Sequence, residues 1–166
     1  RLISVSGSGV VYAAPDVFTL SVGVESFHTD ANAALDDNNT RMARVMKGLR
    51  ELGLSEDEIR NTGFQVAKIY LEEEHVGVIE PLSKDGFVGY AAENDIRIRS
   101  HQLSLVEPVI GSVVGWGASS VLSLEFSIED ETEYLLQATA LAVEDAQAKA
   151  QQPVEAAGAA LGEIVV

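Results

Sequence analysis

In the first third of the chain, the spacing of apolar residues changes from every second position to every third or fourth position. This change of period most constrains the fold. From Val17 to Phe27, apolar residues alternate with polar or small ones, which predicts a strand with one buried face. Between His28 and Gly53, apolar residues recur every three or four positions, which predicts an amphipathic helix. Thr29 or Asp30 can cap that helix, and Gly53 can end it.

The same two periods extend through the rest of the sequence. Alternation predicts strands over residues 63–71, 87–99 and 121–128, and helical spacing predicts a helix over residues 105–115. An Ala-rich helix is predicted from Glu131 onward. Pro153 lies inside this last helix and predicts a kink or break near Gln151 and Gln152, because proline removes one helical hydrogen bond.

The glycines of Gly7-Ser8-Gly9 resemble part of a phosphate-binding loop, but the rest of that motif is missing. A dinucleotide fingerprint needs a third glycine where this chain has Tyr12, and no Lys-Ser/Thr pair follows as in a P-loop. Residues 13–16, Ala-Ala-Pro-Asp, carry turn-forming residues. We therefore expect the glycines in the first strand of a β-hairpin, marking a bulge or a close approach of backbones.

The predicted order of elements is β-β-α-β-β-α-β-α. Two β-α-β passages, over residues 17–71 and 87–128, favour an α+β fold with helices packed on a mixed β-sheet that begins with the N-terminal β-hairpin. The length of 166 residues suits one domain spanning residues 1–166.

Composition excludes several classes of partner. Eleven Lys and Arg stand against 26 Asp and Glu, so the net charge is −15, and such a chain repels nucleic acid and anionic lipid. No apolar run is long enough for a membrane span. Without cysteine the chain has no disulfide and no thiolate chemistry.

No catalytic, cofactor-binding or metal-binding constellation is predicted. The three histidines, His28, His75 and His101, lack the spacing of paired metal ligands, and no serine lies in a nucleophile-elbow motif. The acidic run Glu72–His75 could attract a cation, although adjacent acids are more often simply solvated. It belongs to residues 72–86, which we predict to be a loop and a candidate contact surface.

A candidate interaction surface is formed by basic residues of the first helix and the sole tryptophan. These residues are Arg41, Arg44, Lys47, Arg50 and Trp116. The basic side chains form either a solvated helix face or a surface that docks an acidic surface of another copy. Trp116 either plugs the end of the core or protrudes as an anchor for a partner.

Several stretches, taken in order, resemble the SIMPL domain family, also called DUF541, typified by bacterial 26/28 kDa periplasmic or outer-membrane immunogens. They are ISVSGSGVVYAAPDVFTLSVGVES at residues 3–26, ALDDNNTRMARVMKGLRELGLSEDEIRNTGFQV at residues 34–66, GYAAENDIRIR at residues 89–99 and LAVEDAQAKAQQPVEAAGAALGEIVV at residues 141–166. Their order and spacing together carry the resemblance. Pro153 departs from it, since relatives usually have an apolar residue there.

The resemblance implies an exported bacterial α+β protein, periplasmic or associated with the outer membrane, that assembles into ring-like or channel-like oligomers. It also implies a cleaved signal peptide, which we expect to have preceded Arg1. Family members are linked to stress tolerance and envelope function, and no enzymatic activity is established for them. We therefore expect a non-enzymatic homo-oligomer without cofactor, nucleic-acid partner or stable membrane insertion.

Two other functions remain as alternatives. The chain could bind a small ligand in the periplasm, or act as an unrecognised hydrolase, through a pocket between sheet and helices. It could also be an adaptor that binds another envelope protein through Trp116 and the basic helix face.

Overall fold

The computed structural model describes residues 3–71, 82–83 and 86–162. Backbone contacts divide the chain into two units, which we describe separately: Pro15–Ser127, and Arg1–Ala14 together with Ile128–Val166. The expectation of a single domain over residues 1–166 stays a prediction. Most of the predicted 72–86 loop, including the acidic run Glu72–His75, lies outside the described residues.

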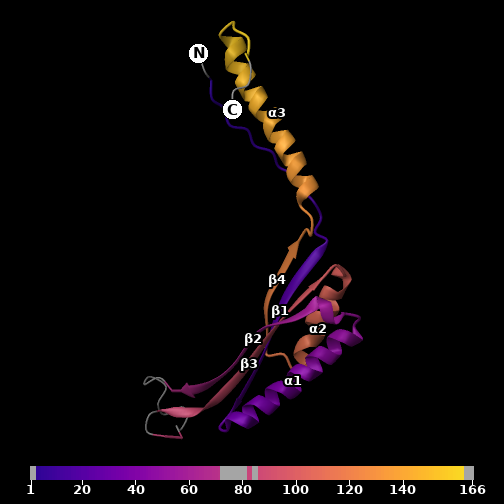
Figure 1. Ribbon diagram of the computed structural model, residues 1–166, viewed down its shortest axis with the longest axis vertical. Helices are drawn as coiled ribbons and strands as arrows, with labels where there is room; N and C mark the ends of the chain where they lie inside the picture. Colours follow the sequence, from indigo (N-terminus) through magenta and orange to yellow (C-terminus); the bar gives the residue numbers. More distant parts are fainter. Residues whose placement is uncertain (1–2, 72–81, 84–85, 163–166) are drawn as a thin grey trace. The chain divides into compact units, whose positions relative to one another are not determined.

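The unit Pro15–Ser127 is a four-stranded sheet with two helices (Figure 1). The strands lie in the spatial order β2-β3-β1-β4, and every neighbouring pair is antiparallel. Along the chain the elements are β1 (Val17–His28), α1 (Ala31–Glu51), β2 (Ile59–Tyr70), β3 (Phe87–Ser100), α2 (Val106–Trp116) and β4 (Ser120–Ser127).

The α+β class is confirmed, but the mixed sheet is wrong. Each β-α-β passage connects two strands that run the same way, and a third strand of opposite direction lies between them: β3 between β1 and β2, and β1 between β3 and β4. This is the split β-α-β arrangement of ferredoxin-like folds. The hydrophobic periods predicted the strands but carried no information on which strands become neighbours.

The first helix forms as its sequence predicts. The side chain of Asp30 accepts a hydrogen bond from the amide of Ala33 at 3.0 Å, and Gly53 follows the helix with φ 103°. The apolar stripe of α1 faces the sheet, where Val45 and Leu49 are fully buried. Local capping and amphipathic spacing therefore suffice to predict this element.

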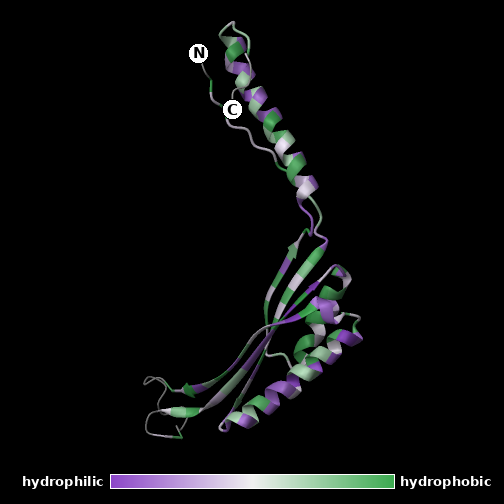
Figure 2. Ribbon diagram, viewed as in Figure 1, coloured by the Kyte–Doolittle hydropathy of each residue, from purple (hydrophilic) through white to green (hydrophobic). Residues whose placement is uncertain are grey.

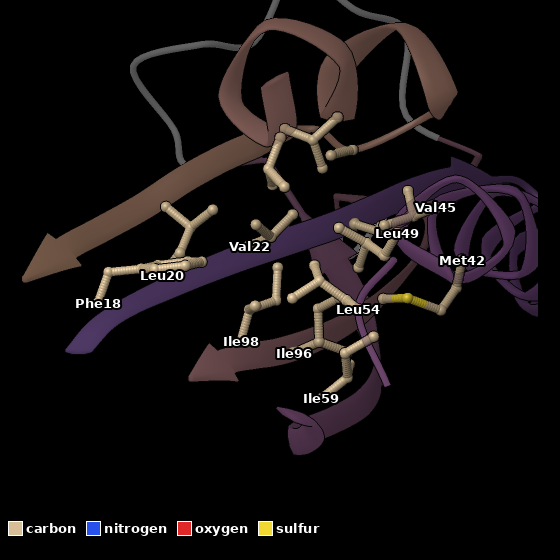
Figure 3. Close-up of a cluster of buried hydrophobic side chains, with 14 residues drawn as sticks. Phe18, Leu20, Val22, Met42, Val45, Leu49, Leu54, Ile59, Ile96 and Ile98 are labelled. Carbon is tan, nitrogen blue, oxygen red and sulfur yellow. The ribbon is translucent and has the colours of Figure 1, made fainter. Parts of the chain in front are cut away.

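The core lies between the sheet and the two helices, and Figure 3 shows its side chains converging from both layers. Alternate residues of β1 and β3 point toward α1 and α2, as the period of two requires. The principal members of this core are Phe18, Leu20, Val22 and Val24 of β1, Ile96 and Ile98 of β3, Met42, Val45 and Leu49 of α1, and Val109 and Val113 of α2.

The second unit contains α3 (Thr132–Ala156) and residues 3–14, which we call the N-terminal segment. The predicted N-terminal hairpin is wrong, because residues 3–16 contain no strand. The segment instead runs beside α3 (Figure 1). Ser8 binds the helix at Asp145 through its amide, at 2.7 Å.

The two glycines explain why the segment can lie so close to the helix. A Cβ atom at Gly7 would be 1.9 Å from the carbonyl oxygen of Ala142, and one at Gly9 would be 1.9 Å from that of Ala138. Alternate residues of an extended chain are about 6.6 Å apart and helix residues four apart rise about 6 Å, so the two spacings match. The expected close approach of backbones is thus present, against a helix rather than a second strand.

Helix α3 continues through Pro153 to Ala156, so a break near Gln151 and Gln152 is wrong, while the predicted kink there stays a prediction. Pro153 lies within the last turn and a half, where the loss of one hydrogen bond leaves little helix to hold in place. Beyond it, Gly158 adopts φ 66° and its amide donates to the carbonyl of Glu155 at 2.9 Å. The helix therefore ends at a glycine rather than at the proline.

Candidate interaction surfaces

Arg41 is engaged within the fold. Its Nε donates to the carbonyl of Gly117 at 3.0 Å, and its Nη2 donates to the hydroxyl of Ser119 at 3.1 Å. Its Nη1 donates to the carbonyl of Glu25. These bonds tie the connection between α2 and β4 to β1, so a structural role accounts for this arginine.

The other four residues of the predicted surface divide into two groups. The guanidinium of Arg50 forms an ion pair with Glu56, with Nη2 2.9 Å from Oε1. Arg44, Lys47 and Trp116 meet at one hollow of about 220 Å³, which Gly48, Glu51 and Gly115 also line. The Nζ of Lys47 lies 3.7 Å from Oε1 of Glu51, so Arg44 is the cation beside the indole ring that can hold a further carboxylate next to an apolar group. An interaction role for these residues stays a prediction.

Gly48 allows Trp116 to lie against α1. A Cβ atom at Gly48 would be 2.4 Å from Cδ2 of the indole, so only glycine leaves room for the ring. Trp116 is partly buried and packs against the core. The position of Trp116 thus agrees with the alternative in which this side chain closes the end of the core, while the exposed part of its ring lines the hollow.

We expect Gly48→Ala to displace Trp116 and to lower the free energy of unfolding by about 1–3 kcal/mol, because the added methyl overlaps the ring. Trp116 is the only tryptophan, so its fluorescence emission will move toward that of a solvated indole. Gly111→Ala in α2 is the matched control: a Cβ there meets nothing within 4 Å, and helix propensity should add about 0.5–1 kcal/mol. Equal effects at the two glycines would contradict the packing described.

A second surface lies on α3. Leu136, Ala140 and Val143 recur at intervals of four and three residues, so they form one stripe, which we call the α3 seam. The next position on this side of the helix is the uncharged Gln147. Leu136 is 67% exposed and Val143 is 49% exposed, and Figure 2 shows apolar residues on successive turns of this helix. An apolar stripe of this spacing is typical of a helix that packs against another element.

The sequence predicted this helix, but we assigned no interacting face to it. The Ala-rich helix has two such faces: the seam, and the face with Ala138, Ala142 and Ala146, which lies under the N-terminal segment. The spacing of residues in the sequence could have identified both faces. The glycine pair at positions 7 and 9 and the alanines four residues apart are both patterns of close backbone packing.

Asp145 holds the N-terminal segment through a small polar network. Its Oδ2 accepts hydrogen bonds from the Nζ of Lys149 at 2.6 Å and from the amide of Ser8 at 2.7 Å. The bond from Lys149, followed by the one from the Ser8 amide, lowers the pKa of Asp145 below its ordinary value of 3.8. This contact therefore favours the ionised carboxylate.

The lowered pKa predicts how the contact depends on pH. The contribution of Asp145 is fully present above its ordinary pKa and is lost as the pH falls through the lower pKa of the folded state. We expect the Ser8 amide resonance in NMR spectra to titrate with this low midpoint and the Asp145→Asn variant to lack the transition. A midpoint at the ordinary value would show that Ser8 and Lys149 do not bind this carboxylate.

The described residues offer no constellation for catalysis at a metal. Nowhere in residues 3–71, 82–83 and 86–162 do three histidine or carboxylate side chains gather as metal ligands do. The ring of His28 accepts a hydrogen bond from the amide of Asp30 at 3.0 Å, which places it at the turn before α1. The amide of Ser8 binds Asp145, so the Gly-Ser-Gly segment presents that donor to a carboxylate of its own chain.

A family model described as SIMPL, protein of unknown function (DUF541), matches residues 3–166. The chain is 25% identical over 163 residues to the 26 kDa periplasmic immunogenic proteins of Brucella melitensis and Brucella abortus. It is 24% identical over 162 residues to the uncharacterized protein YggE of Edwardsiella ictaluri. These alignments cover 98%, 98% and 96% of this chain, which spans 64% of the length of each relative.

The helices were also compared with the requirements of a membrane span. None of those in the described part of the chain combines the length and the hydrophobicity that a bilayer crossing needs.

Proposed function

The chain belongs to the SIMPL (DUF541) family, and from this premise we propose that it is an exported, non-enzymatic protein of the bacterial envelope that acts through self-association. Two of its relatives are named periplasmic, which supports a periplasmic or outer-membrane-associated location for this chain. A stress-related role is part of the same proposal and rests on the family resemblance.

The α3 seam is the observation that carries self-association. Its two large side chains, Leu136 and Val143, expose apolar surface that would gain about 25 cal/mol per Å² when covered. Val10 and Tyr12 of the N-terminal segment, exposed at 64% and 94%, add apolar surface to the same unit. A second copy offers the same uncharged stripe, so seam-to-seam contact buries apolar area without bringing like charges together.

Light scattering behind size exclusion tests this proposal. We expect a defined mass several-fold above the 17.7 kDa of the chain. The variant Leu136→Gln/Ala140→Gln, which puts two polar side chains on the seam, should shift the protein toward smaller species. The control Leu141→Gln/Ala148→Gln makes the same two exchanges at exposed positions of α3 outside the seam and should keep the mass.

A strict monomer at high micromolar concentration would contradict self-association. If the seam variant and the control variant lower the mass of the oligomer equally, the α3 seam does not form the contact. Circular dichroism of both variants checks that the helix is retained.

A partner-binding role is the second candidate, and the hollow at Trp116 favours it. An acidic peptide would be drawn to Arg44 and Lys47, and its binding would change the fluorescence of the adjacent indole. We expect poly-glutamate to produce a saturable change that the double variant Arg44→Ala/Lys47→Ala abolishes and that poly-lysine does not produce. An absence of any change with poly-glutamate would exclude this use of the hollow.

A further inference from the structure

The face of the sheet opposite α1 and α2, which we call the open face, carries charged residues in rows across the strands. Arg60 of β2 and Arg97 of β3 are direct cross-strand neighbours, and both are exposed. Arg99 lies two residues further along β3 on the same face. Together they concentrate three of the eleven basic residues of the chain at one end of the face, and we call the pair Arg60 and Arg97 the arginine row.

The opposite end of the same face carries a carboxylate row. Glu93 of β3 lies directly beside Glu25 of β1, and beside Gln65 of β2 on its other side. The amide Nε2 of Gln65 donates to Oε2 of Glu93 at 2.6 Å, which confirms that these side chains share a face. Glu25 and Gln65 are exposed.

Each row places like charges side by side. Like charges directly opposite each other on a sheet destabilise the pairing, and the face contains one such pair of arginines and one of glutamates. Among the described residues, Arg60 and Arg97 form no salt bridge, nor do Glu25 and Glu93. Four residues separate the rows along β3, which is about 14 Å, too far for the side chains to pair with one another.

Between the arginine row and the carboxylate row lies a middle row whose side chains do not project far from the sheet. Asp95 lies between Gly23 of β1 and Gly63 of β2 in the register of the sheet. A Cβ at Gly23 would be 2.9 Å from Oδ1 of Asp95, and one at Gly63 would be 3.3 Å from its Oδ2. The carboxylate therefore spreads along the sheet over both glycines instead of rising from it.

We infer that the open face docks the open face of a second copy, related by a two-fold axis that runs across the strands along this middle row. Such an axis exchanges the two ends of the face strand by strand, so Arg97 of each copy lies over Glu93 of the other, Arg60 lies over Gln65, and Glu25 lies over Ser21. Packed sheets lie about 10 Å apart, a gap that long arginine and glutamate side chains cross. The two Asp95 carboxylates, lying along their own sheets, stay apart.

Charge complementarity selects this occupant. The contact between Arg97 and Glu93 forms twice in such a dimer and joins opposite charges, whereas a uniformly acidic or basic partner would meet either the glutamates or the arginines with like charge. The inference rests on the proposed self-association and adds a contact surface to the seam. Two separate self-complementary surfaces allow assemblies larger than a dimer.

A charge-reversal experiment tests the contact in the full chain. One variant, Arg60→Glu/Arg97→Glu, makes the face acidic, and a second, Glu25→Arg/Glu93→Arg, makes it basic. Both carry Leu136→Gln/Ala140→Gln, so that the seam does not contribute. We expect each variant alone to associate at least about 10-fold more weakly than the seam variant, and an equimolar mixture to form dimers.

The control Asp36→Arg/Asp57→Arg reverses two exposed charges outside the open face, one on α1 and one between α1 and β2, and should leave association unchanged. Salt gives a second readout that needs no variant of the face: at 1 M NaCl the Debye length is about 3 Å, so the dimer of the seam variant should dissociate.

The outcomes separate this inference from the proposal on which it rests. If the unaltered chain is monomeric at every concentration, self-association itself fails. If it assembles, but the charge-reversed variants keep its mass or their mixture forms no dimer, the open face is not a contact and only this inference is overturned.

Discussion

Replacing Gly7 and Gly9 by alanine will detach the N-terminal segment from α3. Each added methyl would lie 1.9 Å from a helix carbonyl oxygen, and a helix backbone cannot move away without breaking its own hydrogen bonds. The amide of Ser8, which donates to Asp145, will then lose its partner. We expect its hydrogen exchange to accelerate at least about 10-fold, as local opening no longer costs free energy.

Gly162→Ala provides the control for this prediction. Gly162 belongs to the same unit, and a Cβ there meets nothing within 4 Å. Its substitution should leave the exchange of Ser8 unchanged. Undiminished protection of Ser8 in the Gly7→Ala/Gly9→Ala variant would show that the segment does not lie against the helix backbone.

Loss of the Asn38 amide will cause the largest loss of stability in the sheet unit. Asn38 is fully buried, and its Nδ2 donates to the carbonyls of Val24 at 2.8 Å and Ala92 at 2.7 Å. It therefore connects α1 to both central strands. Asn38→Asp keeps the shape but replaces the donor by a carboxylate facing two carbonyl oxygens, so we expect a loss of about 3–5 kcal/mol.

Denaturant unfolding of three variants checks this prediction. Asn38→Ala leaves both carbonyls without this donor and creates a small cavity, and we expect it to cost about 2–4 kcal/mol. Asn39→Ala is the matched control, because Asn39 is the exposed neighbour on the same helix and alanine favours helix. A cost at Asn38 no greater than at Asn39 would be inconsistent with a buried link between α1 and the strands.

The particular elements that the sequence predicted are those whose evidence is local. Helix α1 followed from its spacing and the Asp30 cap, and the alternation in residues 17–27 predicted β1. Strand β2 begins at Ile59, four residues before its predicted start, because the polar residues Arg60 and Asn61 hide the alternation there. The predicted boundary of a strand or helix is therefore inaccurate where polar residues occupy its end.

The candidate surface shows the same limit. Arg41, Arg44, Lys47 and Arg50 are equivalent as a sequence pattern, yet the structure gives Arg41 four hydrogen bonds to β1 and the residues after α2. Arg44 and Lys47 lie instead beside Trp116. Charge alone could not separate them, since the difference is made by groups up to 78 residues away in the chain.

By itself, then, the sequence determined the strands and helices from Val17 onward, the acidic character of the chain and its family, because these depend on neighbouring residues and on composition. Only the tertiary structure decided that the sheet is antiparallel throughout, that Gly7 and Gly9 approach a helix, and that arginines and glutamates form separate rows on one face. Each of these depends on which distant backbones become neighbours, and hydrophobic period is the same for every such pairing.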